Sequence, residues 1–353
     1  MKKFSKDFID PEFFRNGKRK PDFSNILSVL NKKAPPRPTL FEFFMNGDLS
    51  DQIAGGETDV VKRNILTFKN AGYDYVTSGI SEFGFPAGET SKSKHGDAKT
   101  YSLNDTVVIK DRASFEKYKW VEVEDCDFSA LEEYAKHMPD GMKLMVSGPG
   151  GVLENAIRVA GYDNLCYMTD DDPALCRDIF DAVGSRILKY YERCVPHPVV
   201  GILMSNDDWG FKTQTMLSPK QMREYVFPWH RRYAELAHKY GKPAVLHSCG
   251  CFVDVMEDVI EGIGFDGKHS YEDAIEPVES IYERYAGRIA ILGGLDLDFI
   301  CRSEPEQVYD RAVAMLERSA VRGGYGLGSG NSIPTYVPLK NYYAMIAAAV
   351  ANE

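Results

Sequence analysis

Short apolar runs alternate with longer amphipathic stretches along most of the chain. A short apolar run bounded by turn residues is typical of a buried strand, and apolar positions three or four residues apart are typical of a helix. The apolar runs predict eight strands, at Thr39–Phe44, Tyr73–Ser78, Lys143–Ser147, Val199–Ser205, Pro243–His247, Phe265–Lys268, Ile289–Leu292 and Tyr325–Leu327. The amphipathic stretches predict seven helices, at Asp59–Asn70, Pro173–Glu192, Pro219–Tyr240, Phe252–Ile260, Val278–Tyr285, Pro305–Ser319 and Leu339–Ala351.

A strand followed by a helix, repeated about eight times, favours parallel pairing with right-handed crossovers. We therefore predict an α/β fold, a closed (β/α)8 TIM barrel, in which residues 39–353 form a single domain. Residues 1–38 are predicted to be an N-terminal extension, rich in Lys, Phe and Pro, that ends in the stiff proline-rich segment Ala34–Pro38. The working site of such a barrel lies where the C-terminal ends of the strands meet.

Two long insertions follow predicted strands. The segment Glu82–Val123 is polar and includes a predicted hairpin at Lys99–Lys110, and Gly148–Asp172 carries a Gly-Pro-Gly-Gly run and a short helix-like stretch. Both leave the C-terminal ends of strands, so we expect both to overhang the site, as long loops of barrel enzymes commonly do.

Composition narrows the classes of partner. The formal net charge of −10 argues against a protein that binds nucleic acid through its phosphates. The N-terminus has no apolar core of signal-peptide length, and no window approaches the roughly 18 apolar residues of a membrane span. The seven cysteines are scattered and odd in number, which fits reduced thiols. We expect a cytoplasmic protein that binds neither nucleic acid nor membranes.

The sharpest local feature is His247-Ser248-Cys249, which follows an apolar run. An imidazole and a thiol at the rim of a barrel are a plausible pair of zinc ligands, because zinc accepts both nitrogen and sulfur. The alternative is a hydrogen-bonded histidine beside a small buried thiol.

Two further segments end predicted strands. Asp207 and Asp208 are adjacent carboxylates that could orient a histidine or bind a ligand, or else cap a turn and face solvent. Ser329 and Asn331 lie in a glycine-rich run that could let the backbone approach a ligand, or could form a simple turn.

Four more residues lie just beyond predicted strands and are candidates for contact with a substrate, although a structural salt bridge is an equal alternative for each. They are Glu82, Lys268, His269 and Asp296.

Taken in order, several stretches resemble the uroporphyrinogen decarboxylase superfamily over nearly the whole length of the chain. The similar stretches are Arg37-Pro38, Asp207–Gly210 followed by Leu217–Pro219, His247–Gly250, Gly293–Asp296 and Asn341–Met345. The resemblance implies a (β/α)8 barrel and one of two activities.

One branch of that superfamily contains the decarboxylase itself, which uses no metal and grips substrate carboxylates with arginines of an N-terminal motif. Arg37 matches that motif as a substrate ligand, but the partner arginine is absent from Pro38–Glu42, and Ser329 stands where the branch has a late histidine. An acidic chain also disfavours a highly anionic tetrapyrrole.

The other branch contains corrinoid-dependent methyltransferases, whose zinc motif looks like His-x-Cys followed by a distant Cys. His247 and Cys249 match its first half, and the distant cysteine would fall near Ser329–Asn331, where none exists. The resemblance therefore implies zinc on His247, Cys249 and a carboxylate, for which we expect Glu82.

Our leading hypothesis is a methyltransferase that moves a methyl group between a small substrate and a corrinoid protein. Asp207, Asp208 and His247 are its expected catalytic residues, and Asn331 and Ser329 line its substrate site. The alternatives are a metal-free lyase that decarboxylates a tetrapyrrole or a smaller carboxylated substrate, and a protein that binds a corrinoid or tetrapyrrole without turnover. Related barrels often form homodimers.

Overall fold

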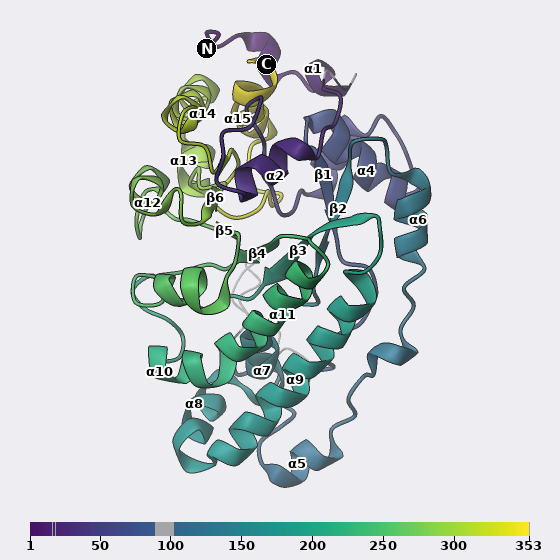
Figure 1. The fold of residues 1–353 in the computed structure, drawn as a ribbon, viewed down its shortest axis with the longest axis vertical. Coiled ribbons are helices and arrows are strands. Elements are labelled where there is room, and N and C mark those ends of the chain that lie inside the picture. Colours follow the sequence, from purple (N-terminus) through teal and green to yellow (C-terminus); the bar gives the residue numbers. More distant parts are fainter. Residues whose placement is uncertain (16, 18, 89–101, 353) are drawn as a thin grey trace.

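The computed structural model describes residues 1–15, 17, 19–88 and 102–352 and is built around one parallel sheet (Figure 1). Its seven strands lie in chain order, so that each pairs with the next. Because each connection in a parallel sheet must return to the end at which the previous strand began, helices join successive strands and cover the sheet. Most strand residues are therefore buried. The strands are β1 (Tyr75–Ser78), β2 (Lys143–Ser147), β3 (Val200–Asn206), β4 (Ala244–His247), β5 (Gly267–His269), β6 (Ala290–Leu292) and β7 (Tyr325–Gly326).

The register of the sheet places three polar side chains at one level. Asn206 of β3 pairs with His247 of β4, and His247 pairs with His269 of β5. Directly paired residues of neighbouring strands have side chains on the same face of the sheet. The strand ends therefore bring both histidines to the same edge.

The strand predicted at Thr39–Phe44 is not formed, so the sheet has seven strands in the described residues instead of eight. Within Thr39–Phe44, only Leu40 forms a parallel bridge, to Leu327 beside β7, and Met45 forms another to Ile333. On the side of β1, the described residues show no backbone hydrogen bond to this segment. The hydroxyl of Tyr75 takes that place instead, because it bonds both the N–H and the carbonyl of Glu42, at 2.7 and 2.8 Å. The sheet thus curls as a TIM barrel does. The gap between β1 and residues 39–45, which we call the barrel seam, is bridged by the side chain of Tyr75.

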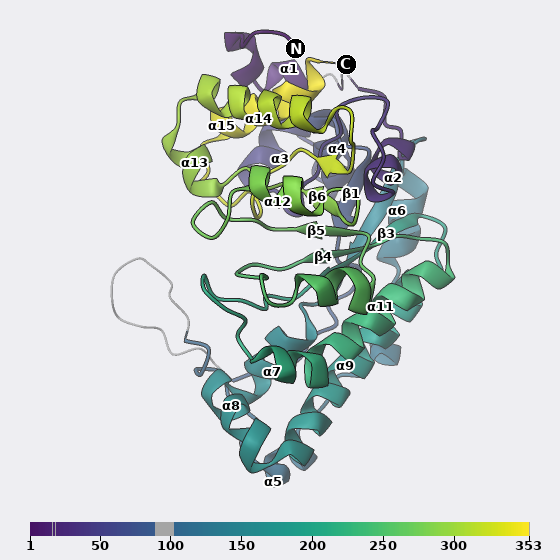
Figure 2. The same ribbon diagram turned by 60° about the vertical axis from the view of Figure 1, so that its left-hand side comes forward.

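The helices surround the sheet, and α9 and α11 lie side by side along one flank (Figures 1 and 2). Six of the seven predicted helices are confirmed to within a few residues, although the one predicted at Pro219–Tyr240 is in three parts. Its middle turn, η3, is a π-helix just before Pro228, a residue that has no backbone N–H to donate. The prediction at Phe252–Ile260 is displaced, since the π-helix η4 covers Asp258–Ile263.

The helix bounds are η1 (Lys6–Ile9), α1 (Glu12–Arg15), α2 (Ser24–Leu30), α3 (Gly47–Ile53), α4 (Val60–Ala71), α5 (Arg112–Lys117), η2 (Val123–Asp125), α6 (Ala130–His137), α7 (Val152–Ala160), α8 (Tyr162–Asp171), α9 (Pro173–Cys194), α10 (Pro219–Gln221), η3 (Met222–Val226), α11 (Phe227–Lys239), η4 (Asp258–Ile263), α12 (Val278–Tyr285), α13 (Leu297–Arg302), α14 (Pro305–Ser319) and α15 (Leu339–Val350).

The N-terminal residues pack on the last two helices through aromatic rings. Phe8 stacks on Tyr309 of α14 at 5.4 Å, and Phe14 stacks on Tyr343 of α15 at the same distance. The two termini lie together in Figure 1. This segment therefore covers the helices beside the seam.

The two insertions differ in content. Gly148–Asp172 forms α7 and α8, whereas the hairpin predicted at Lys99–Lys110 lies partly outside the described residues, and its described part, residues 102–110, contains no strand. None of the helices in the described part of the chain combines the length and apolar composition needed to cross a membrane.

The contact between α9 and α11 gives a stability test. A methyl group at Gly184 would lie 2.2 Å from the nearest ring atom of Trp229, so Gly184→Ala should lower the free energy of unfolding by about 1–3 kcal/mol through overpacking. Gly262 is the matched control, since a methyl group there meets nothing closer than 3.6 Å. Urea denaturation should show Gly262→Ala unchanged or slightly more stable, and equal stability of both variants would contradict close helix packing.

Candidate active site

Three potential metal ligands meet where β3 and β4 end. One ligand atom each of Asp208, His247 and Cys249 lies within 4.8 Å of the other two. The Asp208 carboxylate also accepts the backbone N–H of Cys249 at 2.9 Å, so the two loops hold each other. A nitrogen, a sulfur and an oxygen ligand suit zinc, and three protein ligands leave a fourth position open, as in catalytic zinc sites.

The carboxylate of this group differs from the one expected. Glu82 is exposed and does not belong to the group, whereas Asp208 does. Glu82 lies on the loop after β1, and Asp208 lies on the loop after β3, directly beside β4. The candidate ligand set is therefore Asp208, His247 and Cys249.

Two hydrogen-bond donors converge on the sulfur of Cys249. The Asn331 amide donates at 3.0 Å and the Ser270 hydroxyl donates at 3.3 Å. Ser270 reaches this position with a φ of 84°, a left-handed backbone that is uncommon for a residue with a side chain. Burial and the neighbouring Asp208 charge raise the pKa of the thiol to about 12. A bound cation would reverse this preference, because metal ligation deprotonates a thiol.

The two histidine rings are in contact and are tilted by 45° relative to one another. His247 and His269 bring their Nδ1 atoms within 2.8 Å, and the His269 Nε2 lies 3.2 Å from the Ser329 carbonyl oxygen. Burial lowers the pKa of His247 to about 4 and that of His269 far below its ordinary value. Both rings are therefore neutral near pH 7, and Phe43 covers the His247 ring at 4.6 Å.

The side chains of His269 and Lys268 are both buried and contact other residues of the protein, so neither is exposed to a substrate. His269 is fully buried against His247 and Ser329. The Lys268 ammonium donates to three carbonyl oxygens, those of Ser248, His269 and Ser270, and lies 4.1 Å from the Phe252 ring centre. Burial lowers its pKa to about 7. Both side chains therefore hold the loops that carry Ser248, Ser270 and Ser329, on the side away from solvent.

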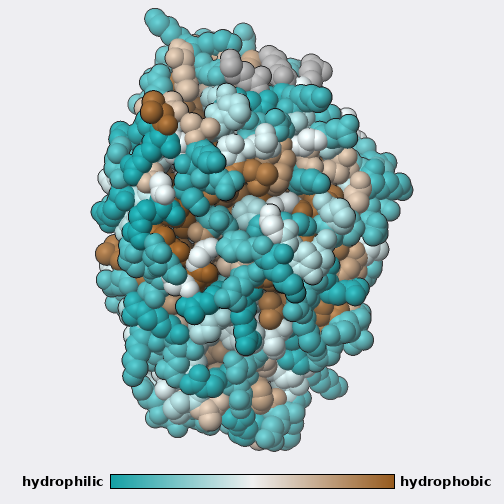
Figure 3. Space-filling view, viewed as in Figure 1, coloured by the Kyte–Doolittle hydropathy of each residue, from teal (hydrophilic) through white to brown (hydrophobic). Residues whose placement is uncertain are grey.

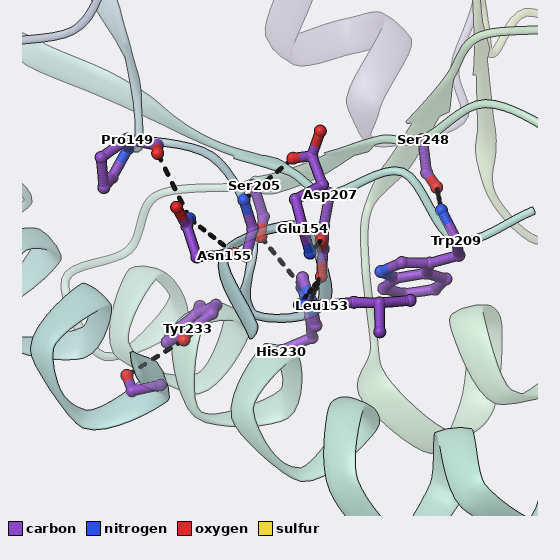
Figure 4. Close-up of polar contacts among 12 residues, drawn as sticks. Pro149, Leu153, Glu154, Asn155, Ser205, Asp207, Trp209, His230, Tyr233 and Ser248 are labelled. Atoms are coloured by element: carbon purple, nitrogen blue, oxygen red, sulfur yellow. Dashed lines mark hydrogen bonds and ion pairs between the residues drawn. The ribbon is translucent and has the colours of Figure 1, made fainter. Parts of the chain in front are cut away.

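Asp207 is also a supporting residue. Its carboxylate accepts the backbone N–H groups of Leu153 and Glu154 at 3.0 and 2.9 Å, at the start of α7, and His230 Nε2 lies 2.8 Å away (Figure 4). A carboxylate at this end of a helix also meets the positive end of its dipole. Gly151 permits the approach, since a Cβ there would lie 1.9 Å from Asp207. With all of its side chain buried, Asp207 is not placed to meet a substrate.

Two carboxyl groups near the site were missed from the sequence. Burial raises the pKa of Glu42 to about 8, and this side chain accepts the N–H and hydroxyl of Ser329 at 3.2 and 3.0 Å. Burial and the charges of Asp207 and Asp208 raise the pKa of Glu154 to about 8. An acid inside the apolar run Thr39–Phe44 was a usable signal for Glu42. Nothing in the sequence places Glu154 beside Asp208, because that contact depends on the position of α7.

Two cavities open at this edge of the sheet, and Cys249 of the ligand group lines the first of them. One, of about 800 Å³, is bounded by Cys249 and Asn331 and includes Asp296 in its wall. Asp296 accepts the N–H groups of Phe299 and Asp273, so it also fixes two loops of that wall. The other cavity, of about 590 Å³, is lined by residues of β1 and β2, by residues of α3 and α4 and by Phe43, Phe44, Met45 and Ser332.

Arg37 lies away from these cavities. Its guanidinium bonds Asp74 at 2.7 Å, just before β1, and the carbonyl of Lys20. This is the N-terminal end of the strands, opposite the histidines. We therefore do not retain Arg37 as a substrate ligand.

The fold and rim thus define a TIM-barrel-like α/β protein with a candidate metal centre. A family model described as uroporphyrinogen decarboxylase (URO-D) matches residues 109–351, and the chain belongs to this family. No curated protein matches the chain.

Among solved structures, a methyltransferase from Methanosarcina mazei is similar with a TM-score of 0.67 at 15% identity, covering 94% of this chain and 98% of the other. This likeness shows a shared fold. An intracellular xylanase from Thermoanaerobacterium saccharolyticum has 13% identity and a TM-score of 0.42, covering 88% and 98% of the two chains. That second score is too low to support an argument.

The buried Glu42 makes stability depend on pH. Its pKa is about 8 in the folded protein, well above the ordinary value of about 4.3 that we expect in the unfolded chain. The stability that it contributes is therefore fully present below about pH 4.3 and is lost as the pH rises toward 8. Glu42→Gln stays neutral, so its free energy of unfolding should fall less steeply, by about 1.4 kcal/mol per pH unit within this window. Urea denaturation at about pH 5.5 and about pH 7.5 measures both slopes, and equal slopes would refute the burial of a titrating carboxyl.

Proposed function

We propose that this protein is a methyltransferase that moves a methyl group between a small substrate and a corrinoid protein, with zinc held by Asp208, His247 and Cys249. The observation that carries the proposal is this compact ligand group at the wall of a cavity of about 800 Å³. Family membership and the shared fold with a methyltransferase from Methanosarcina mazei support it.

The chain's own residues define what such a site can do. Zinc would supply Lewis acidity that lowers the pKa of a bound thiol or other protic group. His247 and Cys249 would hold its position, and the hydrogen bonds that Asn331 and Ser270 donate to the sulfur would limit the charge that this ligand carries to the metal. The cavity leaves room for a small substrate beside Cys249.

Asn331 takes the place of the missing distant cysteine. The resemblance places that cysteine near Ser329–Asn331, and the Asn331 amide lies 3.0 Å from the Cys249 sulfur. This residue reaches the ligand group but offers a hydrogen bond in place of a thiolate. We infer that Asp208 completes the ligand set, so that a harder carboxylate oxygen stands in place of the second thiolate at the same formal charge.

Exposed apolar side chains around the rim support a macromolecular partner. The visible face in Figure 3 is largely hydrophilic, with small separate apolar patches. Apolar groups exposed beside a cavity are typical of contact surfaces. Those on loops or at helix starts after the strands are Phe44, Val60, Phe211, Val253 and Tyr336. In this proposal they meet the corrinoid protein.

A metal-free decarboxylase is the second candidate, because the family takes its name from that activity. It has less support, since Arg37 lies at the opposite end of the strands and Lys268 is buried behind the loops. Both candidates use the same cavity, so metal dependence separates them.

Zinc content tests the proposal directly. Protein purified without chelator should hold about one zinc ion per chain, and His247→Ala and Cys249→Ala should lose it, because each removes one of three ligands. Cys251→Ala is the matched control: its thiol is close in sequence but outside the ligand group, so zinc should be retained. Elemental analysis, with circular dichroism to confirm folding, gives the result. A wild-type protein that binds no added zinc, or equal zinc in Cys249→Ala, would rule out the site.

Methyl transfer is assayed with methylcobalamin as the methyl donor and a small thiol as the acceptor. Removal of the methyl group changes the visible absorbance of the cobalamin, and dialysis against a chelator should abolish the change until zinc is restored. Activity on a carboxylated substrate that is indifferent to chelators would favour the decarboxylase.

Replacement of Asn331 provides a gain-of-function test. Asn331→Cys would bring a second thiolate to the group, and zinc should then bind at least about 10-fold more tightly, since zinc favours thiolate ligands. Ser332→Cys is the control, because residue 332 lines the other cavity. Competition with a chromogenic chelator measures both constants, and an unchanged affinity in Asn331→Cys would remove residue 331 from the metal site.

A further inference from the structure

One proton arrangement is dictated by the contacts of His269. Its Nε2 faces the Ser329 carbonyl oxygen at 3.2 Å, and a carbonyl can only accept. The Nε2 must therefore carry a proton. The ring is fully buried, and neither of its two hydrogen-bond partners among the described residues is a carboxylate, so a second proton would leave an uncompensated charge.

The proton on His247 follows from this. A neutral His269 protonated at Nε2 has a bare Nδ1, which accepts a hydrogen bond from the nitrogen 2.8 Å away. That nitrogen is Nδ1 of His247, which must be the donor. A neutral His247 protonated at Nδ1 has its lone pair on Nε2.

The Ser329 peptide is itself held in place. The carboxyl group of Glu42 accepts hydrogen bonds from the backbone N–H and the side-chain hydroxyl of Ser329, at 3.2 and 3.0 Å, and Ser329 is fully buried. The carbonyl that directs His269 is thus fixed by the segment at the barrel seam. Phe41 packs against the His269 ring, with the two ring centres 4.9 Å apart, so the ring is held by a neighbouring side chain as well as by its hydrogen bonds.

We propose that His269 is a positioning residue that fixes His247 as the Nδ1–H tautomer, leaving Nε2 as its ligand atom beside Asp208 and Cys249. The role of that lone pair as a metal ligand rests on the proposed function, whereas the tautomer does not. In metal sites, loss of the partner that orients a histidine ligand commonly weakens metal binding about 10–100-fold.

The tautomer is measured without any metal. Long-range ¹H–¹⁵N correlation spectra of the metal-free protein, labelled on histidine, separate protonated from bare ring nitrogens, and His247→Gln assigns the signals. We expect a proton on Nδ1 of His247 and on Nε2 of His269. A proton on Nε2 of His247 in the wild-type protein would overturn the proposal.

Two variants of residue 269 test the positioning. His269→Leu removes the acceptor, so the signals of His247 should become a mixture of tautomers and zinc should bind about 10–100-fold more weakly. His269→Asn places an oxygen acceptor near the former Nδ1 and should restore the single tautomer and an affinity within about 3-fold of wild type. Circular dichroism verifies that both variants fold. An unchanged tautomer and affinity in His269→Leu would refute the role, as would equal losses in both variants.

The two proposals fail separately. A wild-type protein that binds no zinc refutes the proposed function, while the nitrogen spectra still decide the tautomer. Zinc binding that survives His269→Leu unchanged refutes the positioning role and leaves the proposed function standing.

Discussion

The carboxylate of Asp207 determines the geometry of the whole rim. It receives two backbone N–H groups from the start of α7 and lies against His230, with all of its surface buried. Without it, two helix-end donors would be buried unpaired, each at a cost of about 1–3 kcal/mol. Because Asp208 is the next residue, the same contact that fixes the insertion also fixes a candidate metal ligand. An insertion that could have been a mobile loop becomes part of a rigid wall.

Much of the scaffold followed from the hydrophobic pattern. The apolar runs located all seven strands, and Val278–Tyr285 and Pro305–Ser319 were predicted to the residue because caps and prolines mark their starts. The strand at Thr39–Phe44 was wrong, because pairing depends on what stands opposite, and Tyr75 stands there. A pattern of apolar residues shows that a segment is buried, not which groups satisfy its backbone.

The sequence predicted where the candidate site lies better than it predicted what each residue of the site contacts. Position after a strand correctly drew attention to His247 and Cys249, which the structure brings together with Asp208. The same rule could not separate Asp207 from Asp208, although one is buried under α7 and the other adjoins Cys249. The structure places Glu82 outside this group and Arg37 on Asp74, because a rim position, or a match to a motif, contains no information about distance across the barrel. Those distances come from the packing of distant segments.

The second cavity lies at the same gap in the sheet that the Tyr75 hydroxyl bridges. A full backbone ladder would hold residues 39–45 within about 5 Å of β1, whereas a phenol ring between them spans a wider gap. The cavity of about 590 Å³ is lined from both sides of this gap, by Phe43 and Met45 on one and by Thr77 and Ser78 on the other. This cavity therefore opens where residues 39–45 and β1 form no backbone ladder among the described residues. The segment predicted as a strand thus lines a cavity of ligand size instead of pairing with β1.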